Sequence, residues 1–125
     1  MGDRGNIIIE KDGQDFKHQV VFYTHFSGSE LPLIVRNALI RGRSRWDDSS
    51  YLARVIFSEL VKDDIDGLSG YGISTEIGDG GDQIVSVFIQ QQRVTFHKSF
   101  GLENMTFEEL VAAKLTGWRN SDDNE

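Results

Sequence analysis

Cysteine is absent from this 125-residue chain, and its absence excludes several kinds of chemistry together. A chain without thiols forms no disulfide, carries no thiolate nucleophile and binds no zinc through cysteine. Proteins without disulfides are typical of reducing compartments, so we expect a cytoplasmic protein. Long hydrophobic runs are absent as well, because Ile7-Ile8-Ile9 is much too short for a signal segment or a membrane span. Where a myristoylation signal has Ser or Thr, this chain has Asn6.

The common nucleotide and metal motifs are also missing. No GxxxxGKS or GxxxxGKT segment is present and no GxGxxG follows a predicted strand, so we expect no P-loop, no dinucleotide-binding fold and no cofactor. His18, His25 and His97 are scattered without the spacing of zinc ligands. Asp79 and Asp82 lie in a glycine-rich loop that resembles a calcium loop only loosely, and a hairpin turn explains them better. We therefore expect no metal site.

The composition indicates one globular domain. Hydrophobic residues make up 38% of the chain and charged residues 26%, which is ordinary for a folded protein. A chain of this length buries enough surface to form one core without disulfides or metals. We expect a single domain over residues 1–120, followed by an acidic, flexible tail over 121–125.

The signals for strands and helices occur in groups along the chain. Turn residues separate the strands at 11–13 and 78–82, Pro32 suits the first turn of a helix, and Thr106 with Glu109 forms a capping box before the last helix. The last three strands are joined by short loops, which predicts an antiparallel meander. The order β-β-α-α-β-β-β-α therefore predicts an α+β fold in which helices cover one side of a mainly antiparallel five-stranded sheet. The expected strands span 6–10, 18–26, 71–77, 83–90 and 93–97, and the expected helices span 32–42, 49–62 and 106–117.

Charge is distributed unevenly along the chain. The formal net charge is −7, so a nucleic-acid partner is not expected. The segment 36–46 nevertheless holds four arginines and no acid. Guanidinium groups bind phosphates and an indole can stack on a base, so Arg41, Arg43, Arg45 and Trp46 predict a site for an anionic ligand. Salt bridges to nearby acids and a protein interface are the two other interpretations.

A second candidate site lies at the end of a predicted strand. Tyr23 and His25 share one face of that strand, and Ser27-Gly28-Ser29 follows at the start of a helix. A hydroxyl, an imidazole and free backbone N–H groups could together hold a phosphate, or the two side chains could simply be half-buried packing residues. The imidazole of His25 also suits acid–base catalysis. No nucleophile-elbow pattern accompanies it, so we expect no catalytic residue.

Two strand features bear on partners. Gly72 interrupts a predicted strand, which is typical of a bulge or of the close approach of another backbone, a ligand or a neighbouring subunit. The strand 83–90 presents Val85, Val87 and Ile89 on one face with few charges, so this face must be covered. The third helix or a second copy of the chain could cover it, and we therefore also consider a homo-oligomer.

Five short segments carry a resemblance that covers most of the first 80 residues: Arg4-Gly5-Asn6-Ile7, Tyr23-Thr24-His25, Gly28-Ser29-Glu30-Leu31-Pro32, Gly42-Arg43-x-Arg45-Trp46-Asp47, and Tyr51-Leu52-Ala53-Arg54. Together they resemble a group of short uncharacterised proteins from phages and mobile elements of prokaryotes. The resemblance assigns no catalytic or binding residue. It implies that the chain belongs among small acidic proteins that often act in host takeover or in evasion of host defence.

These observations favour a small non-enzymatic binding protein of phage type. It would sequester an anionic, nucleotide-like ligand, and so evade host defence, through Tyr23, His25, Trp46 and the arginines of 41–45. A first alternative is an acidic inhibitor that binds a host protein by mimicking nucleic acid. A second alternative is a small hydrolase that uses His25.

Overall fold

The computed structural model describes residues 2–10, 19–78 and 81–115. The turn expected at 11–13, the centre of the glycine-rich loop at 79–80, the end of the third helix at 117 and the acidic tail at 121–125 lie outside the described residues. The main elements in chain order are β1 (Gly5–Glu10), β2 (Gln19–Thr24), α1 (Leu31–Arg41), α2 (Ser49–Val61), β3 (Tyr71–Ser74), β4 (Ile84–Phe88), β5 (Arg93–Phe96), β6 (Met105–Thr106) and α3 (Phe107–Ala112), with 3-10 turns η2 (Gly28–Glu30), η3 (Arg43–Arg45) and η4 (Lys98–Phe100).

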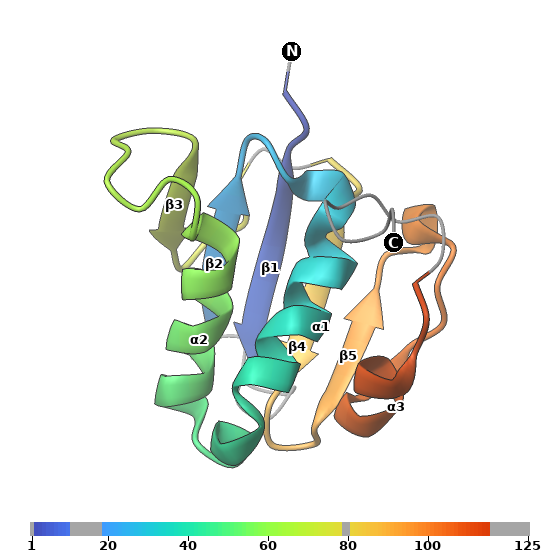
Figure 1. Ribbon diagram of the computed structural model, residues 1–125. Helices are drawn as coiled ribbons and strands as arrows, with labels where there is room; N and C mark the ends of the chain where they lie inside the picture. The colour runs from blue at the N-terminus through green and yellow to red at the C-terminus, as the bar shows by residue number, and fades with distance from the viewer. Residues whose placement is uncertain (1, 11–18, 79–80, 116–125) are drawn as a thin grey trace.

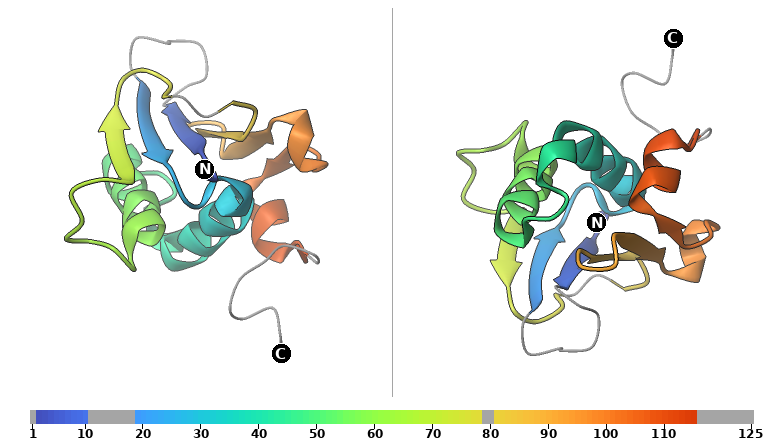
Figure 2. Two further views of the ribbon diagram at one scale, coloured as in Figure 1. Left: turned by 90° about the horizontal axis from the view of Figure 1, so that it is seen from above. Right: turned by 90° about the horizontal axis from the view of Figure 1, so that it is seen from below.

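The fold is α+β, as predicted, with one open sheet and helices on one of its faces (Figures 1 and 2). The strand order is β3-β2-β1-β4-β5-β6. Only β1 and β4 pair in parallel, and the other neighbouring strands pair antiparallel. The sheet has six strands and not the expected five, because the two residues Met105 and Thr106 add to β5 just before α3.

The predicted meander of the last three strands is wrong in one connection. β3 lies at an edge of the sheet, and β2 and β1 separate it from β4. Because β3 and β4 run in the same direction and are not neighbours, the segment between them does not form a hairpin. The side chain of Asn6 in β1 holds this segment: Asn6 Nδ2 donates to the Gly78 carbonyl at 3.2 Å, and the Gly78 N–H donates to Asn6 Oδ1 at 3.0 Å.

The fully buried strand β1 explains this arrangement. All six of its residues are buried, and three consecutive β-branched isoleucines suit a central strand with both faces covered. Neighbouring side chains on a strand point to opposite faces, so Asn6 lies on the face away from the helices when Ile7 points toward them. Strand β4 is also central, so its apolar face is covered within the chain by the helical layer.

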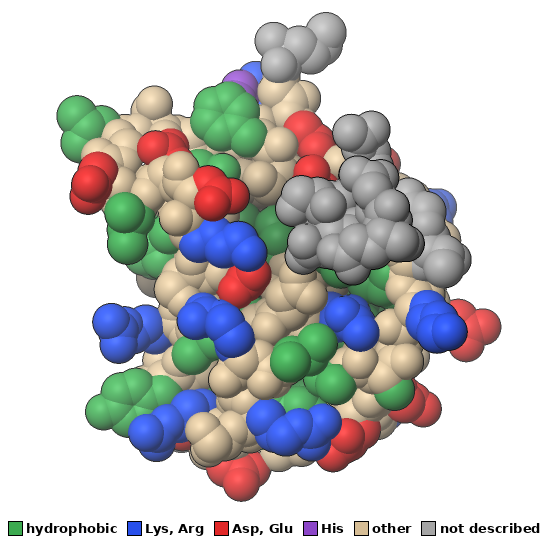
Figure 3. All heavy atoms as spheres, in the orientation of Figure 1, with side chains coloured by type: hydrophobic (Ala, Val, Ile, Leu, Met, Phe, Trp, Pro, Cys, Tyr) green, Lys and Arg blue, Asp and Glu red, His purple; other side chains and the backbone are tan. Residues whose placement is uncertain are grey.

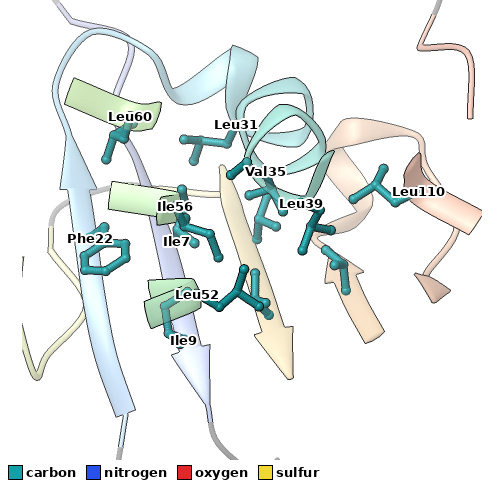
Figure 4. Packing of buried hydrophobic residues seen from close by; sticks show 14 of the residues in the cluster. Ile7, Ile9, Phe22, Leu31, Val35, Leu39, Leu52, Ile56, Leu60 and Leu110 are labelled. Atoms are coloured by element: carbon teal, nitrogen blue, oxygen red, sulfur yellow. The ribbon is translucent and has the colours of Figure 1, made fainter. Parts of the chain in front are cut away.

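One core joins the sheet to the helices (Figure 4). The helix α2 begins after Asp48, whose carboxylate accepts the Tyr51 N–H, and the predicted capping box of Thr106 and Glu109 is present at α3. The helix α3 is shorter than expected, because Ala113 already has extended backbone with ψ 145°. The labelled core residues of Figure 4 are Ile7, Ile9 and Phe22 from the sheet, Leu31, Val35 and Leu39 from α1, Leu52, Ile56 and Leu60 from α2, and Leu110 from α3.

Candidate binding surfaces

The six residues predicted to form one anion site lie in two separate groups. Tyr23 and His25 are at the end of β2, close to the start of α1. Arg41, Arg43 and Arg45 are at the other end of α1 (Figure 1). A helix of 11 residues is about 16 Å long, so one small ligand does not contact both groups.

Trp46 belongs to the core and not to an open stacking surface. Its side chain is 7% exposed, and its indole N–H donates to the Leu39 carbonyl at 3.0 Å. Its ring meets Phe107 edge-on, with 5.3 Å between the ring centroids, and the Arg43 guanidinium lies 4.4 Å from its centroid. A buried indole needs a partner for its N–H, and the carbonyl of Leu39 supplies it. The expectation that Trp46 stacks on a base is therefore not met.

Two of the predicted arginines bind acids of this chain. Arg41 Nε donates to Glu59 Oε1 at 3.0 Å, and its Nη2 donates to the Ser58 hydroxyl at 2.6 Å. Glu59 is buried and also binds Lys62, with 2.9 Å between the charged atoms. Arg41 therefore ties the end of α1 to α2. The interpretation of the arginine segment as internal salt bridges holds at this position.

Arg43 makes a two-pronged pair with Glu108 of α3. Its two terminal nitrogens donate to the two Glu108 carboxylate oxygens at 3.0 and 3.2 Å. This hydrogen bonding raises the pKa of Arg43 and lowers the pKa of Glu108. Both side chains are more than half exposed, so solvent screens the pair and its contribution to stability is small.

Arg45 differs from its two neighbours. Among the described residues it has no ion pair, and its guanidinium lies 4.8 Å from the centroid of the exposed Tyr51 ring. The two acids that follow the arginine segment in the sequence bind elsewhere: Asp48 caps α2, and Asp47 accepts a hydrogen bond from Gln92 at 2.9 Å. Arg45 is therefore the arginine of the predicted anion site that stays open to solvent, and the exposed ring of Tyr51, which was not predicted to belong to that site, lies beside it.

Tyr23 and His25 do lie on one face of the strand end, as predicted. The Tyr23 hydroxyl and His25 Nδ1 are 3.3 Å apart, and the Phe26 ring meets the imidazole edge-on with 5.1 Å between centroids. Both residues are half-buried. Within the described part of the chain no carboxylate lies within ion-pair distance of His25, and the Tyr23 hydroxyl is the side-chain group that contacts its Nδ1.

The helix start expected to attract a phosphate is already filled by a carboxylate of this chain. Asp3 accepts hydrogen bonds from the Ser29 backbone N–H at 3.0 Å and from the Ser29 hydroxyl. Gln83 Nε2 donates to the same carboxylate at 2.7 Å. Burial raises the pKa of Asp3, but the hydrogen bonds from Ser29 and Gln83 outweigh it, and the pKa lies below its ordinary value. Asp3 therefore takes the place that a bound anion was expected to fill.

A hollow elsewhere on the described surface is also poorly suited to an anionic ligand. An open hollow of about 220 Å³ is lined by Asp47, Ser49, Ile89 and Gln90, and its acid disfavours an anion. Across residues 2–10, 19–78 and 81–115, no three His, Asp or Glu side chains group as metal ligands would. No described helix combines the length and the apolar character needed to cross a membrane.

The predictions from the sequence did not include one further exposed surface. Among the described residues, five of the seven large hydrophobic side chains that are exposed lie in β3, in the segments before and after it, or just after β2. We call this surface the acidic apolar edge, because acids flank it (Figure 3, upper left). Its apolar members, with their exposed fractions, are Phe26 57%, Ile65 75%, Leu68 102%, Ile73 60% and Ile77 51%. Its acids are Asp63, Asp64, Asp66 and Glu76.

A sequence signal for this surface does exist. The segment 63–70 reads as a polar, glycine-containing connection, yet it contains Ile65 and Leu68. Exposed apolar residues inside a loop are a better indication of binding than the same residues in a strand. Comparison of the chain with protein-family models, curated proteins and solved structures found no match.

Proposed function

We propose that this chain is a non-enzymatic binding protein that engages a partner protein of basic surface through the acidic apolar edge. The observation that carries the proposal is the exposure of Ile65 and Leu68, at 75% and 102%, beside Asp63, Asp64 and Asp66. This is the inhibitor alternative from the sequence, and the acidic apolar edge is the surface that supports it.

Burial of the exposed apolar side chains would supply the free energy of binding. Burying one exposed Leu, Ile or Phe side chain is worth about 1.5–3 kcal/mol. Leu68 is fully exposed and Ile65 nearly so, and both belong to the same loop. Monomeric proteins rarely keep such a group of apolar side chains in water, and a patch of this kind with a polar rim marks an interaction site.

The charges of the acidic apolar edge favour a partner with a basic surface. Residues 63–78 contain four acids and no basic residue. A field of one sign attracts a partner of the opposite sign and speeds association at low salt. A nucleic-acid-binding protein is a target of this kind, because its binding face is basic. An acidic protein that covers such a face acts as an inhibitor, and a phage-type origin would make the target a host protein.

The test is a capture experiment with a matched control. The wild-type chain, the double variant Ile65→Ser with Leu68→Ser, and the control Ile40→Ser are each immobilised. Ile40 is 45% exposed on α1, so the control removes an exposed apolar side chain outside the acidic apolar edge. Captured proteins are identified by mass spectrometry and purified for affinity measurement.

We expect the double variant to weaken binding of the purified partner by about tenfold or more, and Ile40→Ser to leave it unchanged. We also expect the affinity of the wild-type chain to fall as salt is raised, because the acids are exposed and screened. Equal binding by all three proteins contradicts the proposal. So does a captured partner whose contact surface is acidic.

A second candidate function is favoured by Arg45 and Tyr51. The pair offers an exposed cation and an exposed ring, and Arg54 lies one helical turn from Tyr51 on α2. This smaller group could bind a nucleotide by charge and stacking, which retains part of the predicted anion site. A panel of mononucleotides and inorganic phosphate would raise the melting temperature of the wild-type chain, and Arg45→Ala with Tyr51→Ala would abolish the shift. No shift with any member of the panel removes this candidate.

A further inference from the structure

The outer edge of β3 carries backbone groups that are ready to pair with another strand. The His25 N–H donates to the Gly70 carbonyl at 2.8 Å. This bond shows which residue pairs of the β2–β3 ladder are hydrogen-bonded and which are not. Along the same register Tyr23 faces Gly72. Residues of an antiparallel pair alternate between hydrogen-bonded and non-hydrogen-bonded positions. The N–H and C=O groups of Gly70 and Gly72 therefore point to β2, and those of Tyr71 and Ile73 point outward.

This edge lacks the usual protection against pairing. Edge strands are normally blunted by proline, by charged side chains or by a covering element. β3 contains Tyr71, Gly72, Ile73 and Ser74, with no charge and no proline. A Cβ atom placed on Gly72 would meet no described atom within 4 Å, so one face of the strand is open. The opposite edge of the sheet is different, because β6 has two residues and continues directly into α3.

We infer that the partner adds an extended, basic segment to the outer edge of β3. This inference rests on the proposed function and adds the mode of recognition. Backbone hydrogen bonds to Tyr71 and Ile73 give the added strand its register, and the Ile73 side chain, 60% exposed, packs against an apolar side chain of that segment. Lysine or arginine side chains at the alternate positions meet the acids of the edge.

Charge separates this partner from a second copy of the chain. Two copies that paired antiparallel through β3, centred on Gly72, would place Glu76 of one copy beside residue 68 of the other. Glu76 would then lie close to the loop that carries Asp64 and Asp66. Like charges at such short range oppose association, and no basic residue lies between 63 and 78 to offset them. A basic segment meets the same acids with favourable sign.

The experiment uses the whole chain and three synthetic peptides. The first peptide alternates lysine and valine, the second has glutamate in place of lysine, and the third is the first peptide with every backbone nitrogen methylated, so that neither of its edges can donate hydrogen bonds. Amide hydrogen exchange of Tyr71 and Ile73 is followed by NMR. We expect the lysine–valine peptide to slow exchange at both amides by about tenfold, and the other two peptides to leave it unchanged.

Two variants test the backbone contribution. Ile73→Pro removes an N–H that points away from β2, so proline is compatible with the existing ladder and blocks only the added strand. Ile73→Thr keeps that N–H and the β-branched shape. We expect Ile73→Pro to abolish binding of the lysine–valine peptide and Ile73→Thr to retain it.

The outcomes are distinguishable from those of the capture experiment. Peptide binding that perturbs Ile65 and Leu68 without protecting Tyr71 and Ile73 overturns strand addition and leaves the proposed function standing. Equal protection by the glutamate peptide overturns the choice of a basic partner. Protection without any peptide that disappears on dilution identifies a second copy as the occupant and overturns the inference. Failure of the lysine–valine peptide to protect either amide also overturns it, whereas the proposed function depends on the separate effect of Ile65→Ser with Leu68→Ser.

Discussion

The carboxylate of Asp3 binds both the backbone N–H and the hydroxyl of Ser29, and so closes the start of the turn that leads into α1. The backbone adds two bonds between the same segments: the Asp3 N–H donates to the His25 carbonyl and the Gly28 N–H donates to the Asp3 carbonyl, both at 2.7 Å. A segment before β1 is thereby joined to the end of β2. The arrangement that looked suited to an external phosphate is an internal structural contact.

We predict that Asp3→Asn destabilises the protein at neutral pH by about 1 kcal/mol, because an amide replaces a charged acceptor. The folded-state pKa of Asp3 is lowered, so the stabilisation is present above the unfolded-state pKa and is lost as pH falls through the folded-state pKa. The difference in unfolding free energy between wild type and variant should therefore shrink below about pH 4. Chemical denaturation at a series of pH values measures it, with the exposed Asp66→Asn as control. A difference that grows in acid contradicts this account.

A side chain at Gly28 would cause a steric clash at the same contact between the segment before β1 and the turn that leads into α1. Gly28 is buried, and a Cβ there would collide with the backbone of Arg4 and the side chain of Gln83. We predict that Gly28→Ala costs about 1–3 kcal/mol of stability. Gly72→Ala is the matched control, because its Cβ has open space, and it should change stability by no more than about 0.5 kcal/mol. Thermal unfolding of both variants decides the matter, and equal melting temperatures refute the close approach at Gly28.

Local sequence signals predicted the elements well, and pairing between distant strands much less well. Proline at the start of α1, Asp48 before α2 and the capping box at α3 act within one or two helical turns, so their effect is visible in the sequence. The place of β3 depends on its pairing with β2, in which Phe22 faces Ile73, and the segment after β3 is held by the Asn6 side chain, which is 72 residues from Gly78 in the sequence. Loop composition alone favoured a hairpin there, because glycine and aspartate suit turns of many kinds.

The candidate site shows the same limit. The sequence shows four arginines without neighbouring acids, but the acids that bind Arg41 and Arg43 come from α2 and α3. Trp46 is buried because α3 packs on it, and nothing adjacent in the chain indicates that contact. Exposure of Ile65 and Leu68 is likewise a tertiary property. Charge and aromatic content therefore suggested a site. The tertiary contacts show that Arg41 and Arg43 bind acids of this chain and that Arg45 does not do so among the described residues.

The difference between Arg41, which binds a buried acid, and Arg45, which has no ion pair among the described residues, predicts different results when each is replaced by alanine. Arg41→Ala should destabilise the protein by about 1–2 kcal/mol, because it leaves the buried Glu59 with one cation fewer. Arg45→Ala should leave stability almost unchanged, since Arg45 has no ion pair among the described residues. Denaturant midpoints of the two variants give the comparison. If Arg45→Ala is the more destabilising change, Arg45 has a structural role that the Tyr51 contact does not explain.

The two hydrogen bonds between the Asn6 side chain and the Gly78 backbone are expected to hold the segment that follows the edge strand β3. Asn6 is fully buried and uses both ends of its amide on the Gly78 backbone, so Asn6→Ala removes two hydrogen bonds that no neighbouring side chain restores. We predict a loss of about 1–3 kcal/mol and faster hydrogen exchange at the Gly78 amide. Gln19→Ala is the control, because its side chain donates to the Thr75 carbonyl from an exposed position. If Asn6→Ala leaves Gly78 exchange unchanged, the segment is held by other contacts. If exchange also rises at Tyr71 and Ile73, the side chain of Asn6 sets the rigidity of the edge that we propose receives the partner strand.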